Sequence, residues 1–269
     1  MERLSFAPFS CKADDFTTFL SVGISIRHNM AHRNTTASAL QNQHNIHSST
    51  RIIVLISGNG TNLQALIDAC ATNTLPSTSI VRVISNRKDA YGLIRAATAD
   101  PPIPTIYHNL VKYKKEHPKT DEGVQQARKA YDAELARLLL ADSPDLVVCA
   151  GWMHILADDF LDPLTEANVP VINLHPALPG QFNGANAIQR AHAAFQQGDI
   201  QETGVMVHYV ISEVDMGEPI LVRKVTMVAG ESEADLAQRI HRVEWEIIVD
   251  GTELVVRRLR EEKSQIVDQ

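Results

Sequence analysis

An amide and an imidazole stand two residues apart at the end of an apolar segment, as Asn173 and His175. Successive side chains of a β-strand point to opposite faces, so this spacing puts both groups on one face, with Leu174 on the other. Ligands of an open α/β sheet bind beyond the carboxyl ends of its strands, which is where the pair would lie. Such a pair could donate hydrogen bonds to a reacting oxygen and exchange a proton, or His175 could serve the structure alone.

A glycine-rich turn, residues 57–62, separates an apolar segment from a helical one and has the sequence Ser-Gly-Asn-Gly-Thr-Asn. Backbone N–H groups at such a turn, and at the start of the following helix, favour a phosphate. Leu63 occupies the third glycine position of a dinucleotide fingerprint and no Gly-Lys-Ser/Thr follows, so the turn matches neither that motif nor a Walker loop. The glycines could also serve only a turn that needs a positive φ.

An acidic turn, residues 213–218, lies between two β-rich segments late in the chain. A carboxylate from this turn, such as that of Asp215, could approach His175 and favour its protonated form. Asp and Gly are also the usual residues of a solvated turn, and without further information the solvated turn is the simpler interpretation.

A further loop, residues 151–156, follows another apolar strand and has the sequence Gly-Trp-Met-His-Ile-Leu. Met153 and Leu156 could line a pocket for an aromatic ring. Their spacing alone favours a place in the hydrophobic core.

The segments that would position these motifs alternate between short β-branched runs and helical stretches from residue 51 onward. This alternation predicts an α/β fold, a doubly wound and mostly parallel sheet with helices on both faces. Strands are predicted at 52–56, 80–84, 146–150 and 169–172, and helices at 63–71, 92–99 and 124–140. The longest of these helices carries one apolar stripe, formed by Ala127, Tyr131, Leu135 and Leu138.

The pattern changes after Gly204, where two long β-rich segments, 205–211 and 220–227, predict a late β-hairpin. Ser232 and Asp235 predict a capping box ahead of a closing C-terminal helix. The apolar stripe of that helix holds Leu236, Ile240 and Val243.

Residues 1–50 differ from the rest of the chain in composition. They are rich in Ser, Thr, Asn and His, and their only acids are Glu2, Asp14 and Asp15. We therefore predict a poorly ordered N-terminal extension over residues 1–50 and one folded domain over residues 51–269. Few acids with scattered Arg also occur in transit peptides, but no amphipathic Arg-bearing helix is evident, so a start codon assigned too early is the simpler interpretation.

The composition argues against several classes of function. The 269 residues are 44% hydrophobic and 21% charged with a net charge of −7, which indicates a globular protein without the basic surface that binds nucleic acid. No apolar run reaches the length of about 18 residues that a membrane helix needs. The three cysteines, Cys11, Cys70 and Cys149, include no C-x-x-C pair, which predicts a reducing, cytoplasmic setting without a metal site. Cys149 lies in an apolar run and is expected to be a buried thiol.

Taken together, these segments resemble the stand-alone glycinamide ribonucleotide formyltransferases of purine synthesis. The resemblance covers residues 51–249, and its motifs stand in the order of that family, at 55–68, 85–87, 145–156, 173–176 and 207–219. The loop 179–184, Pro-Gly-Gln-Phe-Asn-Gly, is most similar to the fungal branch. The resemblance implies transfer of a formyl group from the cosubstrate 10-formyltetrahydrofolate to the amine of 5-phosphoribosylglycinamide, without a metal.

The resemblance also implies which residues bind each substrate. The ribonucleotide phosphate would lie against Gly60, Thr61 and Asn62. A second ribonucleotide contact would come from His241, Arg242, Val243 and Glu244, with Glu244 as the ribose acceptor. The folate would lie against Met153, His154, Ile155, Leu156, Asn173, Ile211, Ser212, Glu213, Val214 and Asp215, with Arg128 near its polar end.

The implied catalytic residues are Asn173, His175 and Asp215. When the amine attacks the formyl carbon, negative charge develops on the former carbonyl oxygen, and hydrogen-bond donors must stabilise it. Asn173 would offer its amide N–H and a protonated His175 a second donor. Asp215 would keep the imidazole charged near neutral pH, or take the amine proton through a water.

The chain departs from the family pattern at a few positions. His154 stands where many relatives have Arg, so any positive charge there is weaker or depends on pH. Asn186 replaces a common histidine, which argues against a required acid or base at that position, and Trp245 replaces a histidine after Glu244. His208 matches a family histidine within a strand, and we expect a hydrogen-bonded structural role for it.

Other functions remain open from the sequence. A formyltetrahydrofolate hydrolase, or a formyltransferase acting on methionyl-tRNA, would use the same Asn, His and Asp set, but such proteins usually carry an additional domain, for which residues 1–50 show no periodicity. A non-catalytic nucleotide-binding module would need only the turn at 58–62. Small-molecule substrates are the expected partners, and the sequence does not determine the oligomeric state.

Overall fold

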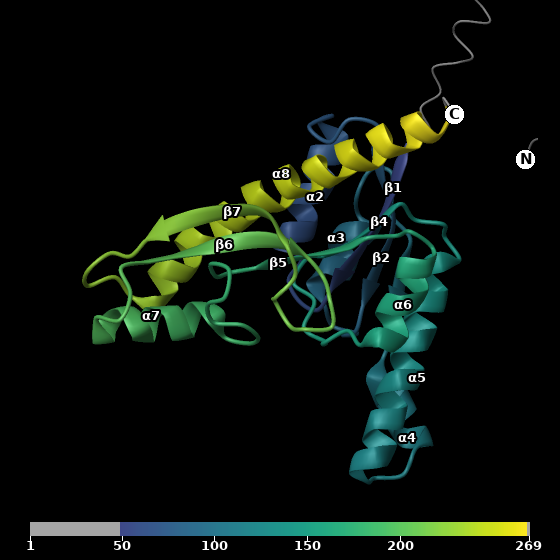
Figure 1. The fold of residues 1–269 in the computed structure, drawn as a ribbon, viewed down its shortest axis with the longest axis horizontal. Helices are drawn as coiled ribbons and strands as arrows, with labels where there is room; N and C mark the ends of the chain where they lie inside the picture. The colour runs from purple at the N-terminus through teal and green to yellow at the C-terminus, as the bar shows by residue number, and fades with distance from the viewer. Residues whose placement is uncertain (1–48, 268–269) are drawn as a thin grey trace, which may run out of the picture. The chain divides into compact units, whose positions relative to one another are not determined.

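The computed structural model describes residues 49–267, and these form one α/β unit (Figure 1). The predicted N-terminal extension lies outside the described residues except at its end, where Thr50 begins the first strand. The strands are β1 (Thr50–Ile56), β2 (Thr78–Ser85), β3 (Thr105–Tyr107), β4 (Leu146–Cys149), β5 (Val171–His175), β6 (Glu202–Tyr209) and β7 (Pro219–Thr226). The helices are α2 (Thr61–Ala71), α3 (Tyr91–Ala97), α4 (Leu110–Glu116), α5 (Asp121–Leu140), α6 (Asp158–Glu166), α7 (Ala187–Gln197) and α8 (Glu233–Val267).

The seven strands form a single sheet in the order β3-β2-β1-β4-β5-β6-β7. Strands β1 to β5 run parallel to one another, and β6 and β7 pair antiparallel at one edge. The prediction of a doubly wound, mostly parallel sheet with a late hairpin is confirmed. Because the parallel strands share one direction, the ends of β4 and β5 meet at the same edge, where polar side chains follow both strands.

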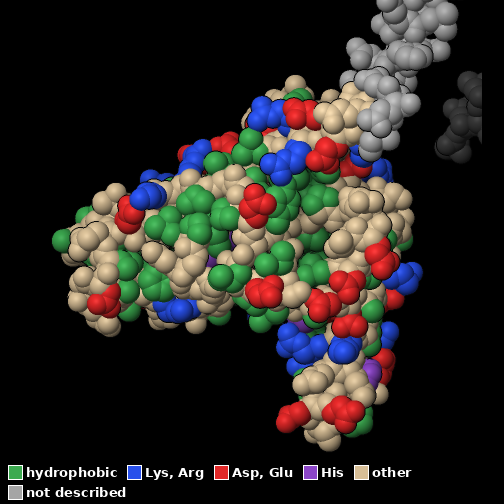
Figure 2. Space-filling view, in the orientation of Figure 1, with side chains coloured by type: hydrophobic (Ala, Val, Ile, Leu, Met, Phe, Trp, Pro, Cys, Tyr) green, Lys and Arg blue, Asp and Glu red, His purple; other side chains and the backbone are tan. Residues whose placement is uncertain are grey.

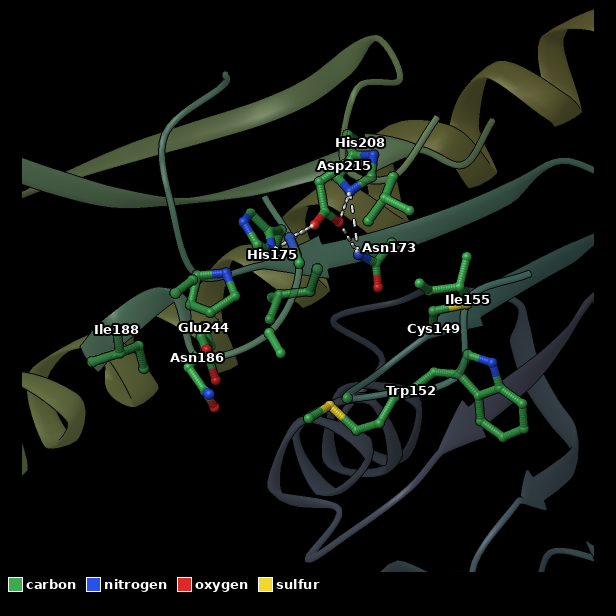
Figure 3. A pocket seen from close by; sticks show the side chains of 18 of the residues that line it. Cys149, Trp152, Ile155, Asn173, His175, Asn186, Ile188, His208, Asp215 and Glu244 are labelled. Carbon is green, nitrogen blue, oxygen red and sulfur yellow. Dashed lines mark hydrogen bonds and ion pairs between the residues drawn. The ribbon is translucent and has the colours of Figure 1, made fainter. Parts of the chain in front are cut away.

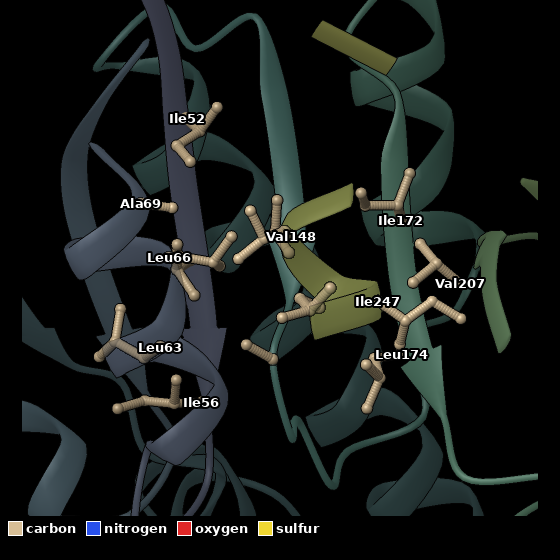
Figure 4. Close-up of a cluster of buried hydrophobic side chains, with 14 of the residues drawn as sticks. Ile52, Ile56, Leu63, Leu66, Ala69, Val148, Ile172, Leu174, Val207 and Ile247 are labelled. Atoms are coloured by element: carbon tan, nitrogen blue, oxygen red, sulfur yellow. The ribbon is translucent and has the colours of Figure 1, made fainter. Parts of the chain in front are cut away.

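Two hydrophobic clusters cover the two faces of the sheet. Residues 52–56 of β1 are fully buried and alternate between the clusters, as expected for a central parallel strand. On one face Leu66 of α2 and Ile247 of α8 pack against β1, β4 and β5 (Figure 4). On the other face Tyr131 of α5 and Phe160 of α6 pack against the same strands.

Helix α8 begins at the predicted Ser232–Asp235 pair, where Ser232 caps the helix and the two side chains bond each other. The backbone N–H of Asp235 donates to Ser232 Oγ at 3.2 Å, and that hydroxyl donates to Asp235 Oδ2 at 2.7 Å. The helix continues for 35 residues, about 50 Å at the usual rise per residue. It packs on β7, β6 and α2, and near its end Arg260 donates to Thr50 Oγ1 of β1. One helix therefore joins the hairpin to the first strand.

Four elements go beyond the sequence-based prediction, namely β3, α4, α6 and α7. Strand β3 has three residues, too few for a periodic pattern, and α6 contains Pro163 in its interior. Helix α5 begins three residues earlier than expected, at Asp121, and the predicted stripe is wrong at Leu138, which is only partly buried. Leu139 takes the buried place on that face.

Acidic and basic side chains are interspersed over the face shown in Figure 2, including the arm formed by α4 and the start of α5. This mixture fits the net charge of −7 and gives that face no continuous basic stripe. Within residues 49–267, none of the helices combines the length and hydropathy needed to cross a membrane.

Candidate active site

A cavity of about 610 Å³ lies at the carboxyl ends of β4 and β5. Its walls are the loop after β4, the end of β5, the start of α7, the segment between β6 and β7, and the first three turns of α8 (Figure 3). The predicted site residues that line it are Asn62, Met153, His154, Ile155, Leu156, Asn173, His175, Ile211, Ser212, Val214, Asp215, His241 and Glu244.

Asn173, His175 and Asp215 meet at one end of this cavity. Asn173 and His175 share a face of β5, while Leu174 lies in the core on the other face. The Oδ2 atom of Asp215 is 3.3 Å from His175 Nδ1, and its Oδ1 atom accepts from Asn173 Nδ2 at 3.3 Å (Figure 3). The Asp215 side chain is 9% exposed, so the acidic turn is not merely a solvated one.

Asp215 is held in place by its own backbone and by a neighbouring loop. Its φ is 57°, a left-handed conformation that Asp adopts more readily than most residues. The backbone N–H of Gly184 donates to Oδ2 at 2.7 Å. Burial raises the pKa of Asp215, but hydrogen bonds with His208 and Gly184 and the proximity of His175 outweigh burial, so the pKa lies below its usual value. The carboxylate is therefore ionised at neutral pH.

His175 differs from the expectation of an imidazolium near neutral pH. Burial lowers the pKa of His175 by more than the attraction of Asp215 raises it, because the side chain is only 5% exposed and His208 adds repulsion. The lowered pKa favours the neutral imidazole at pH 7. The expectation counted the carboxylate and left out the cost of desolvating the cation.

His208 closes this cluster from β6. It is 2% exposed, its Nε2 atom lies 3.2 Å from Asn173 Nδ2 and 3.5 Å from Asp215 Oδ1, and its Nδ1 atom lies 2.8 Å from the carbonyl oxygen of Tyr209. This geometry fits the hydrogen-bonded role expected for it. Its contact with Asn173 follows from the antiparallel register, which pairs the two residues directly and which the sequence does not specify.

Asn62 and Glu244 also line this cavity and contact each other. Asn62 Nδ2 donates to Glu244 Oε2 at 3.2 Å, although the two residues are 182 positions apart. Burial raises the pKa of Glu244, and the Asn62 hydrogen bond and nearby His241 offset this only in part. The carboxyl group therefore tends towards its neutral form.

The turn before Asn62 requires the glycine at its centre. Gly60 adopts a φ of 72°, and a Cβ atom there would lie 2.6 Å from the Cα atom of Gly92. The backbone of this turn therefore requires glycine at position 60, as the alternative interpretation of the turn predicted. It does not exclude a phosphate, because Asn62, in the first turn of α2, lines the cavity.

Comparisons with known proteins bear directly on this site. Residues 50–252 match the model of the formyl transferase family. The phosphoribosylglycinamide formyltransferase of Schizosaccharomyces pombe is 50% identical over 76% of this chain and 96% of its own length, and that of Saccharomyces cerevisiae is 46% identical over 78% and 98%. This chain belongs to the phosphoribosylglycinamide formyltransferases. A solved glycinamide ribonucleotide transformylase from Symbiobacterium toebii superposes with a TM-score of 0.66 at 33% identity, covering 78% of this chain and 89% of that one.

In this formyltransferase the loop after β4 is fixed by a buried acid that the sequence analysis missed. His154 Nε2 lies 2.6 Å from Asp132 Oδ1, and Asp132 Oδ2 accepts from the backbone N–H of Ala157. Asp132 is fully buried on the inner face of α5, and an acid one position after Tyr131 of the apolar stripe was the available signal. The pair leaves Met153 and Ile155 exposed at the cavity, while Leu156 packs in the core.

Six of the residues that the family resemblance implies do not line the cavity. Gly60 and Thr61 immediately precede Asn62, whereas Val243 packs against the hydrophobic core and Arg242 is exposed. The other two are Glu213, which is exposed, and Arg128, which is partly exposed on α5. Their implied roles remain predictions.

The structure also shows where residues that depart from the family pattern lie. Asn186 lines the cavity and adopts a φ of 58° at the start of α7, so a backbone requirement accounts for Asn at that position. Trp245 is 40% exposed and lies beside the buried Glu244. Among the described residues, no group of three or more His, Cys, Asp and Glu side chains is placed to hold a metal ion.

Proposed function

We propose that this chain transfers the formyl group of 10-formyltetrahydrofolate to the amine of 5-phosphoribosylglycinamide, using Asn173, His175 and Asp215. The observation that carries the proposal is the meeting of an ionised carboxylate, an imidazole and an amide within 3.3 Å at one end of a single cavity. Membership of the phosphoribosylglycinamide formyltransferases supplies the two substrates.

The reaction forms a bond between the amine nitrogen and the formyl carbon and breaks the bond from that carbon to the folate nitrogen. A proton leaves the amine and the folate nitrogen gains one. Between these events negative charge rests on the former carbonyl oxygen. The protein must therefore supply hydrogen-bond donors for an oxygen and a path for one proton.

His175 and Asp215 suit the proton path. Burial lowers the pKa of His175, which favours the neutral imidazole at pH 7 and leaves it free to accept a proton. Negative charge on the nearby substrate oxygen would add to that of Asp215, and two negative charges favour the imidazolium. The imidazole would thus become a charged donor only as the reaction develops, with Asp215 ionised throughout.

The cavity offers different surroundings to the two substrates. Exposed apolar side chains at its wall, those of Met153, Ile155 and Ile211, suit the flat ring system of a folate. The Asn62–Glu244 pair and the N-terminus of α2 suit a ribose phosphate, since a carboxyl group binds hydroxyls and a helix start binds phosphate. A cavity of about 610 Å³ is of the size that holds such ligands.

A single assay tests the proposal. The protein is mixed with 10-formyltetrahydrofolate, and release of tetrahydrofolate is followed with and without phosphoribosylglycinamide. We expect release only when the ribonucleotide is present. Release at the same rate without it would show a hydrolase, and no release in either case would show a binding module.

We also propose that the enzyme works in the cytoplasm. Cys70 and Cys149 are free thiols, and burial raises the pKa of Cys149 to about 12, which suits a reducing compartment and no catalytic role for either. Fluorescence of a tagged full-length chain in intact cells tests this. An organellar pattern would contradict it.

A further inference from the structure

Arg95 of α3 binds the glycine turn that precedes α2. Its Nε atom donates to the carbonyl oxygen of Asn59 at 2.8 Å, and its Nη2 atom donates to Asn59 Oδ1 at 3.4 Å. Its Nη1 atom donates to Gln64 Oε1 at 3.2 Å, so one guanidinium connects the turn to the start of α2. Arg95 does not line the cavity, and the mechanism proposed for formyl transfer does not use it.

The backbone of α3 binds the same turn one residue earlier. The N–H of Gly92 donates to the carbonyl oxygen of Gly58 at 3.2 Å. Two successive carbonyl groups of the turn, those of Gly58 and Asn59, are therefore both held by α3.

Holding these carbonyl groups also fixes the N–H groups that follow them. A peptide unit is planar, and in its trans form the carbonyl and the next N–H point in opposite directions. Among the described residues only the Asp100–Pro101 peptide is cis, so both peptides of the turn are trans. The N–H groups of Asn59 and Gly60 therefore point away from the atoms of α3 that hold the carbonyls.

The N–H groups of this turn are available to a ligand. Within residues 49–267, no acceptor is bound to the backbone N–H groups of residues 59–62. Successive free N–H groups at a helix start form a surface that binds anions. A second observation also points to a ligand. Asn62 is 7% exposed and lines the cavity, yet its Oδ1 atom has no hydrogen-bond partner in the described part of the chain.

The guanidinium of Arg95 is itself held in place. Its Cζ atom lies 5.0 Å from the centre of the Tyr91 ring, a favourable position for a cation. Gln64, which it binds, donates in turn from Nε2 to Asp68 Oδ1 at 2.9 Å. A planar fork of donors suits this arrangement, because it meets several acceptors in fixed directions, as a flexible ammonium group does not.

We propose that Arg95 is a positioning residue for the ribonucleotide phosphate, whose contacts with Asn59 and Gln64 hold the turn so that the N–H groups of Asn59 and Gly60 face that phosphate. The inference rests on the proposed function, because the phosphate of 5-phosphoribosylglycinamide is the anion that these groups would bind. Arg95 acts through the turn and does not touch the reacting atoms.

Phosphate binding is measured first, without catalysis, and ribose 5-phosphate is the probe. Backbone ¹H–¹⁵N spectra are recorded while the probe is added to the natural enzyme and to Arg95→Ala. We expect the Asn59 and Gly60 amide signals to shift in the natural enzyme. Arg95→Ala should bind the probe about tenfold more weakly, the value of one hydrogen bond to a charged group. Equal affinity in the two proteins would overturn the proposal.

Kinetics with two acceptors distinguish positioning of the phosphate from general support of the fold. With phosphoribosylglycinamide, Arg95→Ala should raise the KM of the acceptor about tenfold and change kcat and the folate KM by less than about twofold. With ribosylglycinamide, which lacks the phosphate, the natural enzyme and the variant should have the same kcat/KM. A loss of equal size with both acceptors would make Arg95 a purely structural residue and overturn the proposal.

Two further variants separate the shape of the guanidinium from its charge. Arg95→Lys keeps a positive charge but loses the planar fork, so the KM for phosphoribosylglycinamide should stay close to that of Arg95→Ala. A natural KM in Arg95→Lys would show that charge alone acts and would contradict the positioning role. Arg137→Ala is the matched control, because Arg137 binds Glu134 of its own helix, and it should leave both KM values unchanged.

The outcomes separate this proposal from the proposed function. Transfer by the natural enzyme, with the KM for phosphoribosylglycinamide unchanged in Arg95→Ala, would refute positioning by Arg95 and leave the transferase intact. Lack of transfer by the natural enzyme would refute the proposed function. The titration with ribose 5-phosphate would then still decide whether Arg95 supports a phosphate site, because it does not depend on activity.

Discussion

Two carboxyl groups line the same cavity, and their pKa values move in opposite directions. Asp215, a proposed catalytic residue, is largely buried but has a pKa below the usual value. Glu244, the proposed ribose contact, is buried and has a pKa above its usual value. Burial opposes the charged form of both groups, so the difference lies in the partners.

Asp215 receives several favourable contacts and Glu244 receives few. The backbone N–H of Gly184, the amide of Asn173 and the ring of His208 surround Asp215. Glu244 has one close donor, Asn62, and a more distant attraction to His241. The comparison shows that hydrogen-bond donors keep Asp215 ionised, whereas Glu244, with fewer of them, is shifted towards its neutral form. In the proposed function, the first supplies a fixed negative charge and the second a carboxyl group that does not repel a phosphate.

The largest loss of activity is expected when the contact between Asp215 and His175 is disrupted. Asp215→Asn keeps the shape of the side chain, and His175→Ala removes its partner, so each should lower kcat by at least about 100-fold. The KM for phosphoribosylglycinamide should change by no more than about threefold, because uniform binding is untouched. Steady-state kinetics measure both constants. Full transferase activity in both variants would show that the proposed mechanism is wrong.

The glycine turn before Asn62, which we propose positions the ribonucleotide, should tolerate little change. Gly60→Ala would force a side chain into a left-handed backbone and against the backbone of Gly92, at a cost of about 2 to 3 kcal/mol in the free energy of unfolding. The KM for the ribonucleotide should rise as well. Gly58→Ala is the matched control, since a Cβ there meets nothing within 4 Å. Equal effects in denaturant unfolding of the two variants would contradict this account.

Replacing Glu244 should lower kcat much less than replacing Asp215. Glu244→Ala should raise the KM for phosphoribosylglycinamide by about tenfold, the value of one lost hydrogen bond to a ligand, with kcat nearly unchanged. Glu244→Gln keeps an acceptor for Asn62 and should raise KM less. If Glu244→Gln lowered kcat as strongly as Asp215→Asn, the proposed difference in role between the two carboxyl groups would be wrong.

The smallest effect, and the most specific, is the pH dependence of stability. For Glu244 the folded pKa lies above the unfolded one, so the native state binds more protons in that interval and stability falls as pH rises through it. For Asp215 the folded pKa is the lower one, so its contribution is present above the unfolded value and is lost as pH falls through the folded value.

Melting temperatures measured across the acidic range test both signs at once. Relative to the natural enzyme, Glu244→Gln should gain stability as pH rises. Asp215→Asn should be the less stable variant at neutral pH and should approach the natural enzyme in acid. Parallel melting curves for the two variants would contradict the opposite shifts.

Much of the fold was predictable because its signals are local. Residues 52–56 form an unbroken apolar run, which is typical of a strand buried on both faces. Ser232 and Asp235 stand at the spacing of a capping box, and Ser232 caps the helix as that spacing predicts. The sequence did not predict helices α6 and α7, because Pro163 inside α6 and the left-handed Asn186 before α7 are not typical of helices. Tertiary packing stabilises both helices.

The site was predictable only in part. The common face of Asn173 and His175 follows from strand alternation and needs no tertiary information. The family resemblance supplied Asp215 and Glu244 but not their pKa shifts or their neighbours. Asp132 and His208 were not expected at the contacts they make, because register and helix packing decide those contacts.

The sequence by itself determined an alternating α/β chain, a glycine turn before a helix, and an amide and an imidazole on one face of a strand end. Each is a property of the backbone over a few residues. Only the tertiary structure decided that Asp215 lies 3.3 Å from His175, that Asn62 meets Glu244 across 182 positions, and that burial lowers the pKa of His175. Those facts depend on which segments pack together and on how much water they exclude, and desolvation is a property of the whole fold.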